Sequence, residues 1–247
     1  MFRTLLVIVC VLTAPLMAQA PQTEWKGENL QFFPKDISRD RLTQHMREFS
    51  FALNVRCQYC HTGGDGVSFQ GVNFASDEKP AKVKARAMLR MVDRLNHSLL
   101  AELPSRAEPR ITVECATCHR GLPLPKSLQT TLYEIIEQDG ITAATSRYRT
   151  LRQETMAFGR YNFGEWEMNE LARRLNEAGR TDAAIAMLEL NGEFYPKSST
   201  IDVFIAELHR ERGERDQAIV RYRAALAKAP DNALAKKWLA ELERKPQ

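Results

Sequence analysis

Two short segments of the chain share one arrangement of cysteine and histidine. Each is a CxxCH motif: Cys57, Cys60 and His61 form the first, and Cys115, Cys118 and His119 form the second. Two thiols three positions apart can bond to the two vinyl groups of one porphyrin, and the imidazole that follows then lies under the iron as its proximal ligand. The two motifs therefore predict two covalently attached c-type haems, one held by each set of three residues.

Other chemistry is possible for pairs of cysteines. Two CxxC knuckles can bind zinc, and a single CxxC pair can be a redox disulfide. Neither use requires a histidine directly after both pairs, so haem attachment is the preferred interpretation. The fifth cysteine, Cys10, lies in an apolar run at the N-terminus, after Val9. A lipoprotein signal would have a small residue in place of Val9, so Cys10 is interpreted as a hydrophobic residue of a signal peptide.

The iron of the first haem needs a sixth ligand, and a helix predicted over Ser38 to Asn54 offers one. Its apolar residues recur at helical spacing and form one narrow stripe: Leu42, Met46, Phe49 and Leu53. Because His45 points about 100° away from Met46, a helix laid with this stripe on the haem presents sulfur before imidazole. Met46 is therefore the preferred ligand, and His45 is the alternative.

A second helix, predicted over Ala81 to Leu100, offers a ligand for the second haem. Its apolar stripe consists of Ala85, Met88, Val92, Leu95 and Leu99. Met88 lies near the centre of the stripe, Met91 lies at its edge, and His97 points to the far face. We therefore prefer Met88, with Met91 and His97 as alternatives. A methionine on an apolar stripe is also a common packing residue, so periodicity alone leaves both methionine assignments open.

The same predicted helix carries a row of basic residues. Lys82, Arg86, Arg90 and Arg94 recur at i, i+4 spacing, opposite the apolar stripe. A row of this kind is commonly a solvated helix face. The functional alternative is a docking surface for an acidic redox partner protein.

The haem motifs and their surroundings resemble a known family. The stretch from Asn29 to Pro125, with Met46, Met88 and both CxxCH motifs, resembles the photosynthetic reaction-centre cytochrome c subunit. The resemblance implies that a helix with an axial methionine precedes each motif, at Met46 and Met88. The best-known members carry four haems whereas this chain has two motifs, so it resembles the first half alone. The resemblance therefore implies a haem module without implying photosynthesis.

The N-terminus has the pattern of a secretory signal. Arg3 precedes an apolar run from Leu5 to Leu16, and Ala18-Gln19-Ala20 is a small-x-small cleavage pattern. We expect residues 1–20 to be removed, which gives an exported, periplasmic protein without a membrane span. The alternative is a protein that stays anchored to the membrane by an uncleaved N-terminal segment.

Residues 126–247 differ from the haem module in composition and contain an internal repeat. At a separation of 34 residues, five pairs match: Gly179 and Gly213, Asp182 and Asp216, Ala184 and Ala218, Ile185 and Ile219, Pro196 and Pro230. The pattern resembles the tetratricopeptide repeat, with units at 165–198 and 199–232 and a capping helix at 233–244. Asn191 departs from it, because a small residue is expected there. A helical pair broken at Gly140 is expected over Leu128 to Glu154.

These observations predict a mainly α protein of 247 residues with three segments: a signal peptide (1–20), a dihaem cytochrome c module (21–125) and a short α-solenoid (126–247). The formal net charge of +4 is too small to indicate nucleic-acid binding. We expect a single-electron carrier between redox partner proteins, with no catalytic residue and a repeat module for protein interaction. The alternatives are a dihaem enzyme of peroxidase type, if one iron has an open site, and a haem-linked scaffold or sensor.

Overall fold

The computed structural model describes residue 25 and residues 27–104 and 111–244. The expected signal peptide, residues 1–20, lies outside this part. Helices account for most of the described chain, and one two-stranded hairpin is its only sheet. The prediction of a mainly α protein is therefore confirmed.

The chain divides into two compact units. The N-terminal unit comprises residues 1–49 and 56–106, and the C-terminal unit comprises residues 50–55 and 107–247. The first CxxCH motif therefore belongs to the N-terminal unit, and the second belongs to the C-terminal unit. The boundary expected between residues 125 and 126 falls inside the C-terminal unit and stays a prediction.

The N-terminal unit contains both helices expected around the first motif. Helix α1 spans Arg39–Leu53, of which the last four residues belong to the C-terminal unit, and α2 spans Pro80–His97. A hydrogen bond of 3.3 Å from the Arg41 amide to the Ser38 hydroxyl supports the start of α1. Pro80 stands at the beginning of α2, where its missing N–H costs nothing. Helix α2 ends earlier than expected, and the 3₁₀-helix η2, Leu99–Glu102, follows it.

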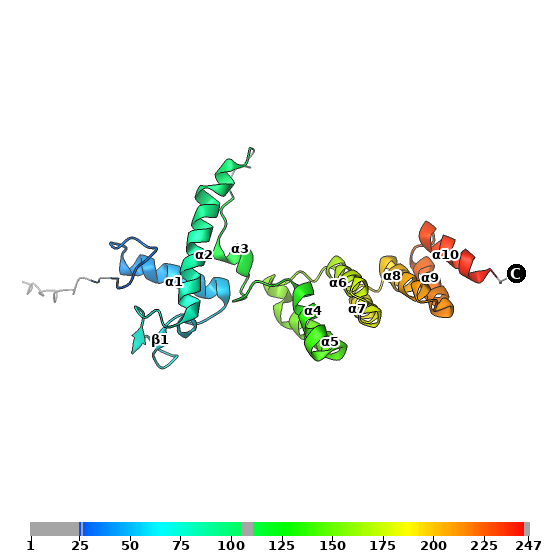
Figure 1. The fold of residues 1–247 in the computed structure, drawn as a ribbon, viewed down its shortest axis with the longest axis horizontal. Coiled ribbons are helices and arrows are strands. Elements are labelled where there is room, and N and C mark those ends of the chain that lie inside the picture. Colours follow the sequence, from blue (N-terminus) through cyan, green and yellow to red (C-terminus); the bar gives the residue numbers. More distant parts are fainter. Residues whose placement is uncertain (1–24, 26, 105–110, 245–247) are drawn as a thin grey trace, which may run out of the picture. The chain divides into compact units, whose positions relative to one another are not determined.

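A short hairpin follows the first motif. The 3₁₀-helix η1 spans Cys57–Tyr59, and the strands β1 (Thr62–Gly63) and β2 (Val72–Asn73) pair antiparallel, with Thr62 opposite Asn73. Gly63 has φ +76°, and a Cβ there would lie 2.3 Å from the carbonyl oxygen of Gly71. Only glycine fits this close approach of the two strands. The hairpin lies at the N-terminal end of α2 (Figure 1).

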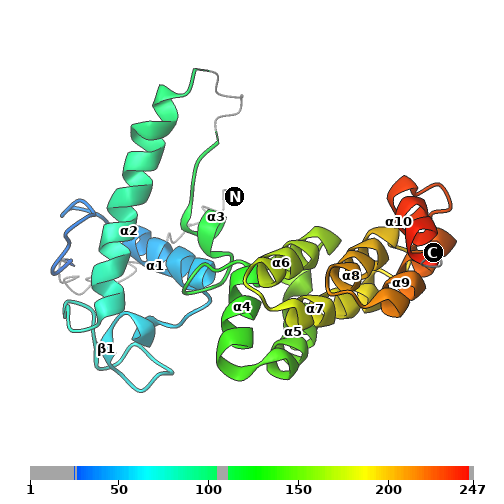
Figure 2. The same cartoon turned by 45° about the vertical axis from the view of Figure 1, so that its right-hand side comes forward.

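The C-terminal unit is a series of helices. They are α3 (Cys115–His119), α4 (Leu128–Asp139), α5 (Ile141–Thr155), η3 (Met156–Phe158), α6 (Glu165–Glu177), α7 (Thr181–Phe194), α8 (Ser199–Glu211), α9 (Arg215–Lys228) and α10 (Ala233–Glu243). Helix α4 packs on α5 and α6, α7 packs on α5, α6 and α8, and α9 packs on α8 and α10, and Figure 2 shows these helices following one another along the unit. The break expected at Gly140 is present, because this residue ends α4 and precedes α5 with φ +88°.

The 34-residue period of the sequence is also a period of the structure. Gly179 and Gly213 both have φ +74° at the turn between two helices, and Ala184 and Ala218 are both fully buried. Small side chains at these positions allow the paired helices to approach closely. The comparison with the tetratricopeptide repeat itself remains a resemblance.

Asn191 shows how the first repeat accommodates its unusual residue. Its side chain is fully buried, and Nδ2 donates hydrogen bonds to the Glu165 carbonyl at 2.9 Å and to Oδ1 of Asn169 at 3.0 Å. The equivalent position in the second repeat is the fully buried Ala225. The asparagine therefore ties α7 to α6 through a polar contact in an otherwise apolar interface.

Candidate haem-binding site

The first motif forms a tight turn directly after α1. The amides of Cys60 and His61 both donate to the carbonyl oxygen of Cys57, at 3.1 and 2.9 Å. This turn brings the three side chains of the motif close together along the chain, and each of them is half-buried. Neither thiol is in a disulfide. Both cysteines are therefore available for covalent attachment of a porphyrin.

The imidazole of His61 lies in a partly apolar environment. The edge of its ring meets the ring of Phe74, with the centroids 5.0 Å apart. Burial, and then the positive charge of Lys82, lower the pKa of His61, while the backbone of Phe74 raises it. Its Nδ1 atom is buried and has no hydrogen-bond partner within the described residues. A neutral imidazole with an unsatisfied nitrogen fits a metal ligand.

The second motif forms α3, a helix of five residues. Glu114 and Thr117 form a capping box at its N-terminus, and the Glu114 amide donates to the Thr117 hydroxyl at 3.0 Å. The helix ends at Arg120 and Gly121, which both have positive φ. The turn that follows carries the chain back over the end of the motif, since the Leu122 amide donates to the carbonyl of His119 at 2.8 Å.

The ring of His119 is fixed by its own chain. Nδ1 lies 2.8 Å from the carbonyl oxygen of Leu122. A carbonyl oxygen only accepts hydrogen bonds, so Nδ1 of the neutral ring carries the proton and Nε2 keeps its lone pair. This is the arrangement in which an imidazole binds a metal through Nε2. The donor set of the second motif therefore also fits a haem.

The N-terminal unit has no apolar core of its own among its described residues, 25, 27–49 and 56–104. No hydrophobic side chain there is buried, and the buried residue is Arg86. Large apolar side chains are instead exposed: Tyr59, Val67, Phe69, Phe74, Val83, Met88, Met91, Leu99 and Leu103. A domain of this size needs another source of stabilisation. A porphyrin supplies a large apolar surface that such side chains can cover, so the composition of the unit also fits the cofactor.

The predicted axial methionines lie on the two helices of the N-terminal unit. Met46 is half-buried on α1, whereas Met88 and Met91 on α2 are both nearly half exposed. Solvent exposure therefore does not distinguish Met88 from Met91 as the axial ligand. Both assignments, Met46 and Met88, stay predictions.

The two alternative histidines have other contacts. His45 stacks on Phe33, with the centroids 5.0 Å apart, and its Nδ1 lies 3.1 Å from Oε2 of Glu48. His97 is mostly exposed at the end of α2, and its Nδ1 lies 3.0 Å from the carbonyl of Asp93. The His45 ring is therefore held by Phe33 and Glu48, and the His97 ring by Asp93 of its own helix.

The predicted basic row on α2 is wrong for its first half. The side chains of Lys82 and Arg86 are only 11% exposed, and both form ion pairs with Asp77. The periodicity of α2 by itself predicts a row that faces solvent, whereas residues 74–77 cover this part of the helix. Arg90 and Arg94 are exposed, as is the neighbouring Lys84.

No role was predicted for Phe74 and Leu122, which contact the histidines of the two motifs. Phe74 reaches His61 because the strand register brings residues 62 and 73 together. Leu122 reaches His119 through a turn with two consecutive positive φ angles. Two-residue strands have no alternating pattern, so the first contact had no signal in the sequence. The glycine after the second motif was the only signal for the second contact.

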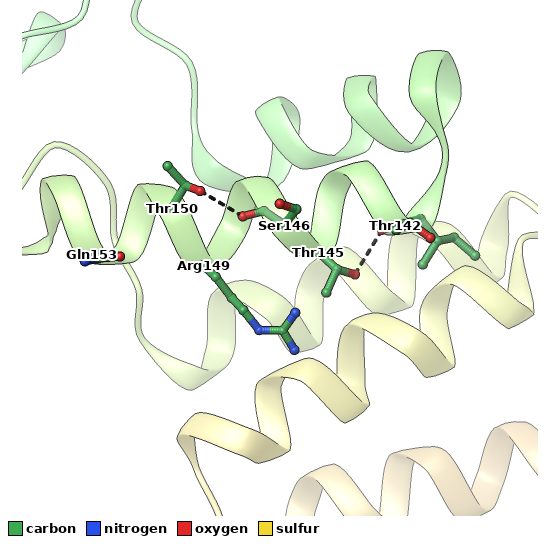
Figure 3. Close-up of a pocket in the computed structure, with 7 residues that line it drawn as sticks. Thr142, Thr145, Ser146, Arg149, Thr150 and Gln153 are labelled. Atoms are coloured by element: carbon green, nitrogen blue, oxygen red, sulfur yellow. Dashed lines mark hydrogen bonds between the residues drawn. The ribbon is translucent and has the colours of Figure 1, made fainter.

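The surface pocket in Figure 3 lies on α5, and neither CxxCH motif contributes a residue to it. It is lined by Ile141, Thr142, Thr145, Ser146, Arg149, Thr150 and Gln153 of α5. The hydroxyls of Thr145 and Thr150 donate to carbonyls of their own helix, and Arg149 pairs with Glu193 at 2.7 Å. Its polar groups are therefore largely engaged within the protein.

Within the described part of the chain, no helix combines the length and apolarity that crossing a membrane requires.

Comparison with known proteins places the haem motifs within a family. A family model described as photosynthetic reaction centre cytochrome C subunit matches residues 13–174, beyond the limit of Pro125 that the sequence suggested. The chain is 40% identical over 88 residues to cytochrome c-554 of Chloroflexus aurantiacus, over 35% of this chain and 19% of that protein. It is 35% identical over 108 residues to the photosynthetic reaction center cytochrome c subunit of Thermochromatium tepidum, over 43% of this chain and 23% of that protein.

A third relative is the photosynthetic reaction center cytochrome c subunit of Roseobacter denitrificans, which is 28% identical over 131 residues, over 52% of this chain and 33% of that protein. The matched segments thus span one third or less of each of these relatives. The family model, by contrast, covers more than half of the 247 residues. On this match, the chain belongs to the photosynthetic reaction centre cytochrome c subunit family.

Proposed function

We propose that this protein is an exported dihaem c-type cytochrome that transfers single electrons between redox partner proteins. Cys57 and Cys60 attach one haem, and Cys115 and Cys118 attach the other. His61 and His119 are the proximal ligands. Met46 and Met88 complete the two coordination spheres.

One observation supports this proposal most directly. The contact of 2.8 Å between Nδ1 of His119 and the Leu122 carbonyl makes Nδ1 the donor, so that in the neutral ring Nε2 of this CxxCH histidine is the nitrogen with a lone pair for a metal. The absence of a buried apolar side chain from the described part of the N-terminal unit supports it independently. When bound, each haem iron supplies one-electron exchange between its ferric and ferrous states.

The proposed chemistry of the protein residues is binding and orientation. The thiols fix each porphyrin to one position along the chain, and the histidines are held in the form that binds a metal. Met46 and Met88 would hold the irons together with His61 and His119, and ligation by a thioether and an imidazole would favour a raised potential. No side chain is assigned to bond making or breaking in a substrate, so the protein is proposed to be an electron carrier and not an enzyme.

The proposed docking surface for an acidic partner consists of Lys84, Arg90 and Arg94 on α2, which are exposed. Lys82 and Arg86 are not part of it. The helical repeats of residues 165–232 are proposed to bind a partner protein, as a short solenoid does through its extended surface. Signal cleavage after residue 20 is tested by sequencing the N-terminus of the exported protein, which is expected to begin at Pro21.

The experiment that tests the proposed function is spectroscopic. The full-length chain is matured in a host with a c-type haem assembly system, and haem per chain is measured by mass. Near-infrared magnetic circular dichroism then detects a methionine-to-ferric charge-transfer band for each iron. We expect two haems and two such bands, with Met46→Leu and Met88→Leu each removing one band and Met91→Leu removing none. A high-spin iron in the wild-type protein would favour the peroxidase-type enzyme, and a chain without covalent haem would refute the proposal.

A further inference from the structure

The ammonium group of Lys82 is enclosed by backbone oxygens. Its Nζ donates to the carbonyls of Phe74, Ala75 and Ser76 at 2.8, 3.0 and 2.7 Å. Oδ1 of Asp77 lies 3.1 Å away. Three protons thus meet four acceptors, and the side chain is only 11% exposed. A lysine held in this way fixes the backbone of residues 74–76 against the first turn of α2.

The segment that Lys82 holds is the one that contacts the first histidine. The ring of Phe74 meets the ring of His61 at 5.0 Å with an angle of 66° between the planes. His61 directly precedes β1 and Phe74 directly follows β2, so the pairing of Thr62 with Asn73 brings the two residues opposite each other. The hairpin therefore sets which residue faces His61, and Lys82 fixes where that residue lies.

The surrounding contacts hold the lysine in turn. Asp77 accepts a hydrogen bond of 2.7 Å from the buried Arg86, whose other terminal nitrogen donates to the carbonyl of Asn29 at 2.9 Å. Nδ2 of Asn29 donates to the Ala75 carbonyl at 2.6 Å. The two charge-assisted hydrogen bonds of Arg86 and the neutral one of Asn29 join the start of the described chain, residues 74–77 and α2 into one network. Lys82 therefore has little freedom to leave its three carbonyls.

The two CxxCH histidines differ in their support. His119 is oriented by the carbonyl of Leu122, three residues along the same chain. Nδ1 of His61 has no such partner in the described structure. The first imidazole is instead contacted, through backbone and ring, by Phe74, which directly follows the other strand of the β1–β2 hairpin.

We propose that Lys82 is a positioning residue for the proximal histidine of the first haem, acting through the backbone of residues 74–76 and the ring of Phe74 on His61. This inference rests on the proposed attachment of a haem at the first motif. Lys82 does not touch the cofactor in this role. It sets the angle at which the His61 ring is presented.

The test compares two lysines of α2 that carry the same charge. Lys82→Met removes the enclosed ammonium group, and Lys84→Met removes an exposed one two residues away. Each full-length protein is matured with haem, counted for haem by mass, and oxidised. Electron paramagnetic resonance then records the g values of the two low-spin ferric haems, which depend on the orientation of the axial imidazole. We expect Lys82→Met to shift or broaden the signal of one haem, and Lys84→Met to leave the g values of both haems unchanged.

Two further variants distinguish the position of the Lys82 ammonium group from its charge, and both from a failure to fold. Lys82→Arg keeps the charge, but a planar guanidinium does not reproduce three protons converging on three carbonyls. We expect it to shift the same signal, and a wild-type spectrum would overturn the positioning role in favour of charge alone. If Lys82→Met matures with fewer than two haems, Phe74→Leu takes its place, because it leaves the backbone contacts of Lys82 intact. If both haem signals keep their wild-type g values in Lys82→Met, or in Phe74→Leu where it replaces that variant, the proposal is overturned.

Failure of the proposed function is recognised separately. It appears as a wild-type chain without covalent haem, before any variant is compared. The Lys82 variants are compared only after the wild-type protein has been shown to carry two haems.

Discussion

Nδ1 of His119 lies 2.8 Å from the carbonyl oxygen of Leu122, three residues further along the chain. The contact forms because the chain turns sharply at Arg120 and Gly121, whose φ angles are +49° and +80°. The histidine of the second motif is therefore oriented by the turn that ends its own helix. Substitutions in this turn should therefore change the orientation of the His119 ring, although the substituted residue itself does not contact the ring.

Gly121→Ala should weaken this turn. Alanine at φ +80° costs about 1–2 kcal/mol of conformational energy. The new Cβ would also lie 3.0 Å from Nε of Arg160, so either the Arg160 side chain or the turn that carries the Leu122 carbonyl must shift. We expect a lower free energy of unfolding in urea and an altered spectrum of the second haem.

Gly66→Ala is the matched control for Gly121→Ala. Gly66 also has φ +80°, but a Cβ there meets nothing within 4 Å. It should show only the conformational cost, with both haem spectra unchanged. Equal spectra for the two alanine variants would contradict the role of the Gly121 turn.

Loss of haem should unfold the N-terminal unit and spare the helical repeats. The described part of the N-terminal unit has no buried apolar side chain, whereas α4–α10 bury two apolar clusters that include the fully buried Leu132, Leu188 and Tyr222. Replacing all four motif cysteines with alanine prevents attachment. Limited proteolysis should then digest residues before α4 and leave a helical fragment. Survival of residues 27–104 as a protected fragment would show that this unit folds without haem.

Acid should loosen the network around Lys82. Hydrogen bonds from Arg86, then from Asn29 and Lys82, hold the pKa of Asp77 well below its usual range. A carboxylate with a lowered pKa in the folded state stabilises the fold above its ordinary pKa, and this contribution is lost as the pH falls through the lowered value. Unfolding in urea, measured from pH 7 down to pH 2, should show a smaller acid-induced loss in Asp77→Asn than in the wild-type protein. Parallel curves would argue against this contribution of Asp77.

Asn191→Ala should destabilise the first repeat. The variant removes two buried hydrogen bonds, to the Glu165 carbonyl and to Asn169, and leaves both acceptors without these donors. The expected cost is about 1–3 kcal/mol in the free energy of unfolding, measured by circular dichroism in urea. Oδ1 of Asn191 is itself buried without a partner. A gain in stability would therefore mean that relief of this unpaired oxygen outweighs the two lost bonds.

The helices were predictable because their signals are local. Apolar residues at helical spacing indicated α1 and α2, and the 34-residue repeat indicated the pairs α6–α7 and α8–α9. Small differences arose at the ends, as where α2 stops at His97 and a 3₁₀-helix follows. Helix ends depend on local hydrogen bonds that periodicity does not show.

Residue types and their spacing were enough to identify two CxxCH motifs, the order of the helices, and a family whose model matches residues 13–174. The side chains that surround the two histidines became visible only in the folded chain. Lys82 and Arg86 were expected on a solvent face, yet residues 74–77 cover Lys82, and Asp77 with Asn29 covers Arg86. Such contacts depend on parts of the chain that lie far apart in sequence, and no local pattern encodes them.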